Sequence, residues 1–186
     1  MSNIGVFCCD PGGHSGVAWA ILDPSAATEA ALQNRQNAGS TTVSGDARTQ
    51  VNELAQLWQS FFRACVRSCL EPKDVYCVFE DFIYNPANTY GGDPAKISTQ
   101  IIWAFEGFRL GCEYQWKVDN PGRKRVLRPA LVLQPAGQAS SYATNDRLRM
   151  WGLWVKGREH ERSAYRHMAL FLKSYQIASR ARRAYA

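Results

Sequence analysis

Short apolar runs separated by turn residues open the chain. Ile4–Cys9 is an apolar run that ends in Asp-Pro-Gly-Gly, and the apolar segment Ser15–Leu22 follows at once, so the two predict a β-hairpin. Glu29–Val43 is richer in Asn, Gly and Ser, and we expect a third strand within it. From Val51 to Cys69 the apolar residues recur at steps of three and four, which predicts an amphipathic helix of about six turns.

The second half of the chain alternates strands and helices. Asp74–Phe82 contains a β-branched and aromatic run that is apolar on both faces, as in parallel strands covered by helices on both sides. Apolar spacing predicts a helix from Ile97 to Phe108, and Ala130–Gln134 is a short strand. We expect a short helix or turn at Thr144–Val155 and a final helix over Glu159–Ser179.

The predicted order of elements is β-β-β-α-β-α-β-α. A hairpin followed by alternating strands and helices predicts an α/β fold, with a mixed β-sheet flanked by helices on both faces. Ser44 and Asp46 are candidate N-caps of the long helix, and Pro72 lies just beyond its end. No linker or internal repeat divides the sequence, so residues 1–186 are predicted to form one domain.

Composition narrows the possible functions. Hydrophobic residues make up 46% of the chain and charged residues 20%, which excludes a wholly disordered protein. The longest uncharged apolar run, Val17–Leu22, is far shorter than the ~20 residues of a membrane helix, and no secretory signal opens the sequence. We therefore expect a cytoplasmic protein without a membrane partner. The net charge of +6 favours an anionic partner.

The six cysteines show no zinc-finger spacing. Cys65 and Cys69 lie four residues apart on the buried stripe of the predicted helix, which allows a metal or redox pair. Small buried hydrophobic residues are the better interpretation of this pair. Reduced thiols fit a cytoplasmic location.

Two carboxylates fall at the ends of predicted strands. Asp10 ends the first strand and Glu80 ends the strand after the long helix, whereas alternation points Asp81 to the opposite face. If the two strands pair in parallel, Asp10 and Glu80 face one spot at the edge where α/β sheets bind ligands. Such a pair can hold a divalent metal or share a proton. Alternatively, Asp10 caps the Pro-Gly turn and Glu80 is solvated.

Several segments resemble one family. Asp10-Pro11-Gly12, with Gly16 and Ala18 in the next strand, resembles the opening of the RuvC-type Holliday-junction resolvases of the RNase H-like superfamily. Val78–Phe82 resembles the second motif of that family. Three later segments resemble its phage-encoded branch: Thr144–Leu148, Gly152–Gly157, and Glu159-His160 followed by Ala164–His167.

The resemblance implies a fold, an activity and partners. It implies an RNase H-like mixed sheet and a homodimeric, Mg²⁺-dependent endonuclease that cuts branched DNA by hydrolysis, with Mn²⁺ able to substitute and no small-molecule cofactor. By similarity, Asp10 would bridge two metal ions, Glu80 would bind one, and His160 would bind metal or handle the water. Part of the helix Val51–Leu70, or the helix from Ile97, could form the dimer face. A phage protein of this kind would act in the host-cell cytoplasm.

One position departs from the family pattern. The family usually has an aspartate three residues after the histidine, and this sequence has Ser163, which is a poorer Mg²⁺ ligand than a carboxylate. Glu159, one helical turn before Ser163, could substitute; Glu161 lies about 200° around the helix and suits less well, and Asp146 is more distant. Otherwise the protein has lost catalysis and only binds DNA junctions, or the serine is an introduced change.

Basic and aromatic residues are candidates for DNA contacts. Two basic clusters could neutralise phosphates: Arg123, Lys124, Arg125 and Arg128, and then Arg147, Arg149, Lys156 and Arg158. Phe82, Tyr84 and Tyr90 could stack on unpaired bases or pin their loop to the body. His14 and His167 could approach the phosphate path, or be a solvated loop residue and a packed core-edge residue respectively.

A different class of function also fits the first turn. Actin- and hexokinase-like nucleotide-binding proteins open with a similar Asp-x-Gly strand turn. Those folds carry two such domains, and 186 residues are too few for both, so this hypothesis is disfavoured. ATP binding by the purified protein would revive it.

Overall fold

Five strands form one mixed sheet. The computed structural model describes residues 2–81, 93–119, 121–122 and 128–184. The strands are β1 (Ile4–Asp10), β2 (His14–Leu22), β3 (Gln36–Ser44), β4 (Val75–Asp81) and β5 (Ala130–Pro135), in the spatial order β3-β2-β1-β4-β5. The first three pair antiparallel, and β4 lies parallel to both β1 and β5. The predicted mixed sheet is therefore confirmed.

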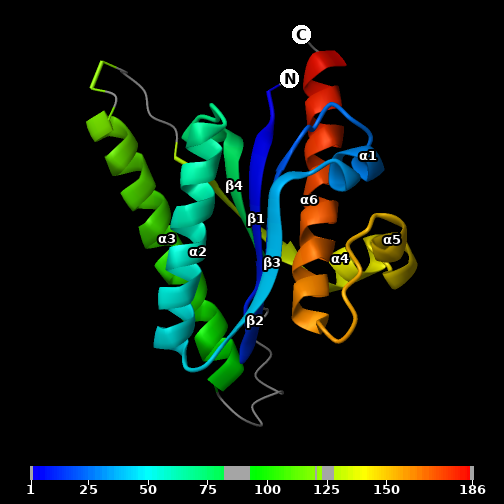
Figure 1. The fold of residues 1–186 in the computed structure, drawn as a ribbon, viewed down its shortest axis with the longest axis horizontal. Helices are drawn as coiled ribbons and strands as arrows, with labels where there is room; N and C mark the ends of the chain where they lie inside the picture. Colours follow the sequence, from blue (N-terminus) through cyan, green and yellow to red (C-terminus); the bar gives the residue numbers. More distant parts are fainter. Residues whose placement is uncertain (1, 82–92, 120, 123–127, 185–186) are drawn as a thin grey trace.

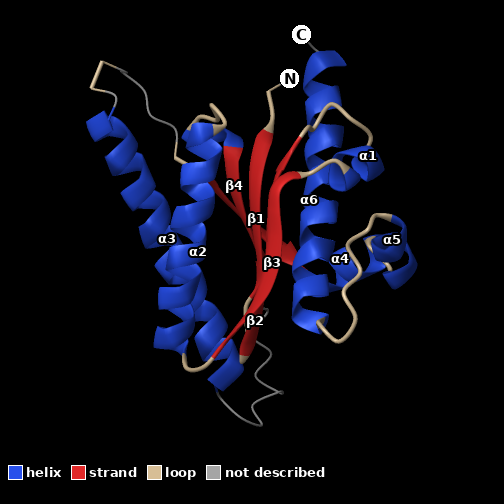
Figure 2. Cartoon of the chain, in the orientation of Figure 1, coloured by secondary structure: helices blue, strands red, loops and turns tan. Residues whose placement is uncertain are grey.

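Helices cover both faces of the sheet (Figures 1 and 2). On one side lie α2 (Ala47–Arg67) and α3 (Asp93–Asp119), and on the other α6 (Glu159–Ala184) runs along the strands. The shorter helices α1 (Thr28–Gln33), α4 (Ala136–Tyr142) and α5 (Asn145–Met150) lie on the α6 side, and the 3₁₀ turn η1 (Pro72–Asp74) leads into β4. This arrangement makes three layers.

Alternation along the central strands divides the core in two. Phe7 and Cys9 pack with the aromatic face of α2 and α3, whereas Val6 and Cys8 pack with the α6 side. The same alternation places Asp10, two residues after Cys8, on the α6 face of the sheet. Both faces of β4 are buried, as its continuous apolar run predicts.

The long helix α2 begins and ends with identifiable signals. The side chain of Asp46 accepts a hydrogen bond from Thr49 N at 2.8 Å, so Asp46 is the N-cap, and Ser44 belongs to β3. At the other end, Leu70 N donates to Cys65 O and Cys69 has a φ of 61°. Cys65 is buried but Cys69 is exposed, so the prediction that both lie on the buried stripe is wrong for Cys69. The helix had already ended at Arg67.

Two further elements differ from the sequence prediction. The segment Glu29–Val43 contains most of the short helix α1 in addition to most of β3. The helix α4, which the sequence did not predict, follows β5 directly. Both helices span fewer than eight residues, too few for a helical period to stand out. No helix among residues 2–81, 93–119 and 128–184 is long and apolar enough to cross a membrane.

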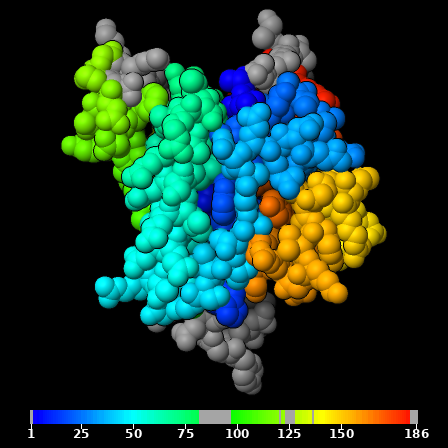
Figure 3. Space-filling view, viewed as in Figure 1, coloured from blue at the N-terminus to red at the C-terminus, as the bar shows by residue number. Residues whose placement is uncertain are grey.

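A glycine lets the start of α6 rest directly on the sheet. A Cβ at Gly16 of β2 would lie 1.9 Å from the carbonyl oxygen of His160, closer than any real contact. In the space-filling view the orange start of α6 lies beside the blue strand segments (Figure 3). Gly16 therefore sets how closely His160 approaches β1 and β2.

We expect Gly16→Ala to displace the start of α6. The added methyl group forces the backbone at His160 to move, which should lower the free energy of unfolding by about 1–3 kcal/mol. Urea denaturation of this variant and of Gly107→Ala measures the effect, because a Cβ at Gly107 meets nothing within 4 Å. Equal stability of Gly16→Ala and the native chain would contradict the close approach.

Candidate active site

The parallel pairing brings two carboxyl groups together. Cys9 of β1 pairs with Phe79 of β4, so the next residues, Asp10 and Glu80, end their strands side by side. Glu80 lies two residues after Val78, which packs on the α6 side, so Glu80 shares that face of the sheet with Asp10. The two carboxyl groups interact through a hydrogen bond and through their charges. The predicted meeting of Asp10 and Glu80 is therefore what the fold produces.

The two carboxyls differ in their affinity for a proton. Burial, followed by the charge of Glu80 and a hydrogen bond with it, raises the pKa of Asp10 to about 7. Burial also acts to raise the pKa of Glu80, but the effect of His167, followed by hydrogen bonding with Asp10 and Ser163, outweighs it and lowers that pKa. Near neutral pH the pair holds a single proton on Asp10 for part of the time, and Glu80 is ionised.

A buried histidine orients Glu80. The ring of His167 is fully buried, and its Nε2 lies 3.1 Å from Glu80 Oε2. Gln134, at the end of β5, donates from its amide nitrogen to His167 Nδ1 at 3.1 Å and accepts from Phe171 N at 3.2 Å. Nδ1 is then the acceptor, so the Nε2–H of His167 donates to Glu80. His167 is thus a positioning residue for Glu80, a role that the sequence left open.

The start of α6 supplies the other wall of the site. His160 Nδ1 lies 3.7 Å from Asp10 Oδ2, and hydrogen bonding to the Ser163 hydroxyl acts to lower the pKa of both carboxyls. A cavity of about 390 Å³ opens here and is also lined by Glu159. The Glu159 side chain is largely exposed, and its Oε1 lies 3.4 Å from Arg162 Nη2, so the proposed substitute borders the cavity but pairs with Arg162.

The turn that carries Asp10 is held by a buried glutamine. Gln50 of α2 donates from Nε2 to the carbonyl oxygens of Gly12, Gly13 and Gly45 at 2.9–3.2 Å. Its Oε1 accepts from Ser15 Oγ at 2.6 Å. In addition, Ser98 Oγ of α3 donates to Pro11 O at 2.9 Å. Sequence reasoning missed Gln50, although a polar residue four positions before Leu54 on an otherwise apolar stripe was the available signal.

We expect Gln50→Leu to loosen this turn. The leucine leaves buried carbonyl groups without a donor, which should lower the free energy of unfolding by about 2 kcal/mol or more. It should also slow any reaction at Asp10 by about tenfold, because reacting groups lose their alignment. The matched control is Gln56→Leu at an exposed position of the same helix. Equal unfolding midpoints for the two variants would show that the hydrogen bonds of Gln50 do not stabilise this turn.

Three further sequence candidates have structural partners. Glu161 is buried and accepts from Ser40 Oγ at 2.6 Å, so it faces β3 rather than the carboxyl pair. Asp146 is exposed and pairs with Arg149 at 2.6 Å. The exposed His14 lies 2.8 Å from Ser44 Oγ, and its ring centroid is 5.9 Å from that of His160. Of the three, only His14 borders the site.

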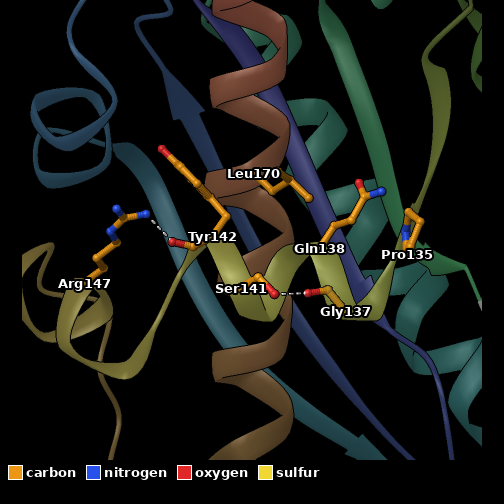
Figure 4. Close-up of a pocket in the computed structure, with 7 residues that line it drawn as sticks. All are labelled: Pro135, Gly137, Gln138, Ser141, Tyr142, Arg147 and Leu170. Carbon is orange, nitrogen blue, oxygen red and sulfur yellow. Dashed lines mark hydrogen bonds between the residues drawn. The ribbon is translucent and has the colours of Figure 1, made fainter.

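The predicted DNA-binding residues divide into two groups. Arg128, Arg147, Lys156 and Arg158 are exposed, and Arg158 also pairs with buried Glu161 at 3.3 Å. Arg147 borders a surface pocket of about 830 Å³ between α4 and α6, where its Nη1 donates to Tyr142 O at 2.5 Å (Figure 4). Arg123, Lys124, Arg125 and Tyr84, with Phe82 and Tyr90, lie outside the described residues.

The carboxyl pair suits a divalent cation. Mg²⁺ keeps several waters and takes one or two carboxylates together with substrate phosphates. A cation beside Asp10 and Glu80 would relieve the repulsion that raises the pKa of Asp10. No three His, Cys, Asp or Glu side chains in the described part of the chain are grouped as a metal cluster, so the ligand set of Asp10, Glu80 and His160 stays a prediction.

Comparisons with known proteins identify the fold. No protein-family model and no curated protein matches the chain. The Thermus thermophilus RuvC structure matches with a TM-score of 0.52 and 12% identity, covering 96% of this chain and 97% of that chain. Thermus thermophilus RuvC in complex with a Holliday junction substrate matches with a TM-score of 0.51 and 12% identity, over 89% and 91%. The predicted RNase H-like fold is therefore confirmed.

Proposed function

We propose that this protein is a metal-dependent endonuclease that binds and cleaves branched DNA, Holliday junctions included. The observation that carries the proposal is the contact of Asp10 with Glu80 at the carboxyl ends of β1 and β4 in a RuvC-like fold. His160 and Ser163 of α6 close the same site. A structure with this fold was determined with a Holliday junction substrate, which supports branched DNA as the partner.

The chemistry is hydrolysis of a phosphodiester. Water forms a new bond to phosphorus, the bond from phosphorus to one deoxyribose oxygen breaks, and that oxygen takes a proton as it leaves. Asp10 and Glu80 would hold Mg²⁺ or Mn²⁺, which supplies charge neutralisation at the phosphate and a more acidic water. His167 keeps Glu80 aimed, and His160 stands where it can accept a proton at the edge of the site.

A second candidate function is junction binding without cleavage. Ser163 favours it, because a neutral hydroxyl stands beside Asp10 at the position of the family aspartate. In this form the protein would keep the fold and the basic surface but hold the metal weakly. The assignment to a phage-encoded branch stays a prediction.

We also propose that two copies assemble, as two symmetric cuts would need. α3 exposes large apolar side chains that its own sheet does not cover: Trp103, Leu110, Tyr114 and Val118. Exposed apolar patches of this kind are typical of protein interfaces. Sedimentation of the native chain and of Trp103→Arg tests this, and a native chain that sediments as a monomer at micromolar concentration contradicts it.

The six free cysteines support a reducing cytoplasmic location.

The deciding experiment uses a labelled four-way DNA junction and a linear duplex of the same sequence. We expect the native chain to bind the junction more tightly and to cut it in Mg²⁺ or Mn²⁺ but not in EDTA. Asp10→Asn should bind equally well and cut about 1000-fold more slowly or not at all. Binding without cutting by the native chain would favour the second candidate. Equal affinity for junction and duplex without cutting would exclude both.

A further inference from the structure

Besides Asp10 of the carboxyl pair, two arginines, Arg162 and Arg166, line the cavity at the start of α6. Ser163 and Asn145 also line it. Arg166 lies three residues after Ser163 on α6 and therefore shares its side of the helix. Positive groups thus border the same cavity as Asp10, the carboxyl that interacts with Glu80.

The Arg166 guanidinium is fixed in place but not neutralised. Its Nε donates to Ala143 O at 3.2 Å and its Nη2 donates to Asn145 Oδ1 at 2.6 Å. Ala143 directly follows α4 and Asn145 is the first residue of α5, and both partners are neutral. A guanidinium has five N–H donors, so three, including both on Nη1, have no hydrogen-bond partner among the described residues. None of the described carboxylates forms an ion pair with Arg166.

The neighbouring arginine is used differently. Arg162 is almost fully buried, donates from Nη1 to Val155 O at 2.7 Å, and lies 4.4 Å from the centroid of the Trp154 ring. Arg149 lies 4.2 Å from the same ring. Arg162 therefore anchors the loop before α6 and adds positive potential, whereas Arg166 keeps free donors beside the cavity. Burial and the charge of Arg162 lower the pKa of Arg166, and the charges of Glu159 and Asp10 oppose this.

We propose that Arg166 binds the scissile phosphate and stabilises the negative charge that builds on it during hydrolysis. This inference rests on the proposed function, and it adds a catalytic residue to it. Planar guanidinium groups match the paired oxygens of a phosphate, and a donor held in advance costs no reorganisation during the reaction. Ser163 makes the site one negative charge poorer than three carboxylates would, so a phosphate beside Arg166 meets less repulsion.

The test compares Arg166→Met and Arg166→Lys with Arg180→Met, an exposed arginine near the far end of the same helix. We expect Arg166→Met to cut the four-way junction about 100-fold more slowly, and Arg166→Lys to keep part of the rate. Added guanidinium ion should restore part of the rate in Arg166→Ala. Arg180→Met should cut at the native rate. A purely structural role would give no rescue.

A binding measurement tests the role of Arg166 in the case where the native chain does not cut DNA. In EDTA, Arg166→Met should reduce the slope of log affinity against log salt for the four-way junction by about 1, as for one lost phosphate contact. A native salt slope, together with a native cleavage rate where the chain cuts, overturns the role of Arg166 and leaves the proposed function standing. A native chain that neither prefers nor cuts the junction overturns the proposed function, and this inference with it.

Discussion

Replacing Asp10 with asparagine should make the metal-free protein more stable at pH 8. The pKa of Asp10 is about 7 in the folded chain against an ordinary value of 3.8, so ionisation is disfavoured by folding. The stability associated with its protonated form is complete below about pH 4 and is lost as the pH rises through 7. The pKa shift of Asp10, about three pH units, corresponds to about 4 kcal/mol of folding free energy. The lowered pKa of Glu80 offsets part of this loss. We expect a net gain on the order of 2 kcal/mol for Asp10→Asn.

Urea denaturation in EDTA at pH 8 and pH 4 measures this gain. The free energies of unfolding of Asp10→Asn and the native chain should differ at pH 8, and the difference should disappear at pH 4. Asp81→Asn, one residue beyond Glu80 on the other face of β4, should show no such pattern. Mg²⁺ should stabilise the native chain at pH 8 by binding the folded form, and should have little effect on Asp10→Asn. A difference that is the same at both pH values would contradict the ionisation of a buried pair.

Replacing Ser163 with aspartate should destabilise the metal-free protein and should strengthen the binding of Mg²⁺. The new carboxylate would join two others, so in EDTA at pH 8 we expect a loss of about 1–2 kcal/mol of stability. With Mg²⁺ present, three carboxylates bind the ion more tightly than two, and the half-saturating concentration should fall at least about tenfold. Junction cleavage should rise with it.

Calorimetric titration with Mg²⁺, beside Ser163→Asn, separates charge from size. The asparagine variant has the same bulk without the charge and should not gain affinity. A third variant, Glu159→Gln, tests whether that exposed carboxylate substitutes for the missing one, since it borders the same cavity. If Glu159→Gln loses cleavage and Ser163→Asp gains no affinity, the charge at position 159 has replaced the aspartate.

The carboxyl pair was predictable because it depends on local rules. Asp10 and Glu80 each end an apolar run, and parallel strands must end at one edge of the sheet. Strand alternation then decides the face, which separates Glu80 from Asp81. The N-cap of α2 followed from Asp46 in the same local way.

The rest of the site depends on contacts between distant segments. Gln50 is 37 residues from Gly13, and His167 is 87 residues from Glu80, so nothing in the local pattern states that they meet. Cys69 shows the converse, because helical spacing continues through it while the chain has already turned. Helical spacing shows where a face points only as long as the helix lasts.

The dependence on α6 has a consequence for synthesis in the cell. The ribosome makes all five strands before this helix, yet His160, Ser163, His167 and one side of the core come from it. A nascent chain therefore carries Asp10 and Glu80 on an uncovered sheet face, without the histidine that aims Glu80. On the proposed function, the nascent chain cannot cut DNA before α6 has been made and has packed on the sheet.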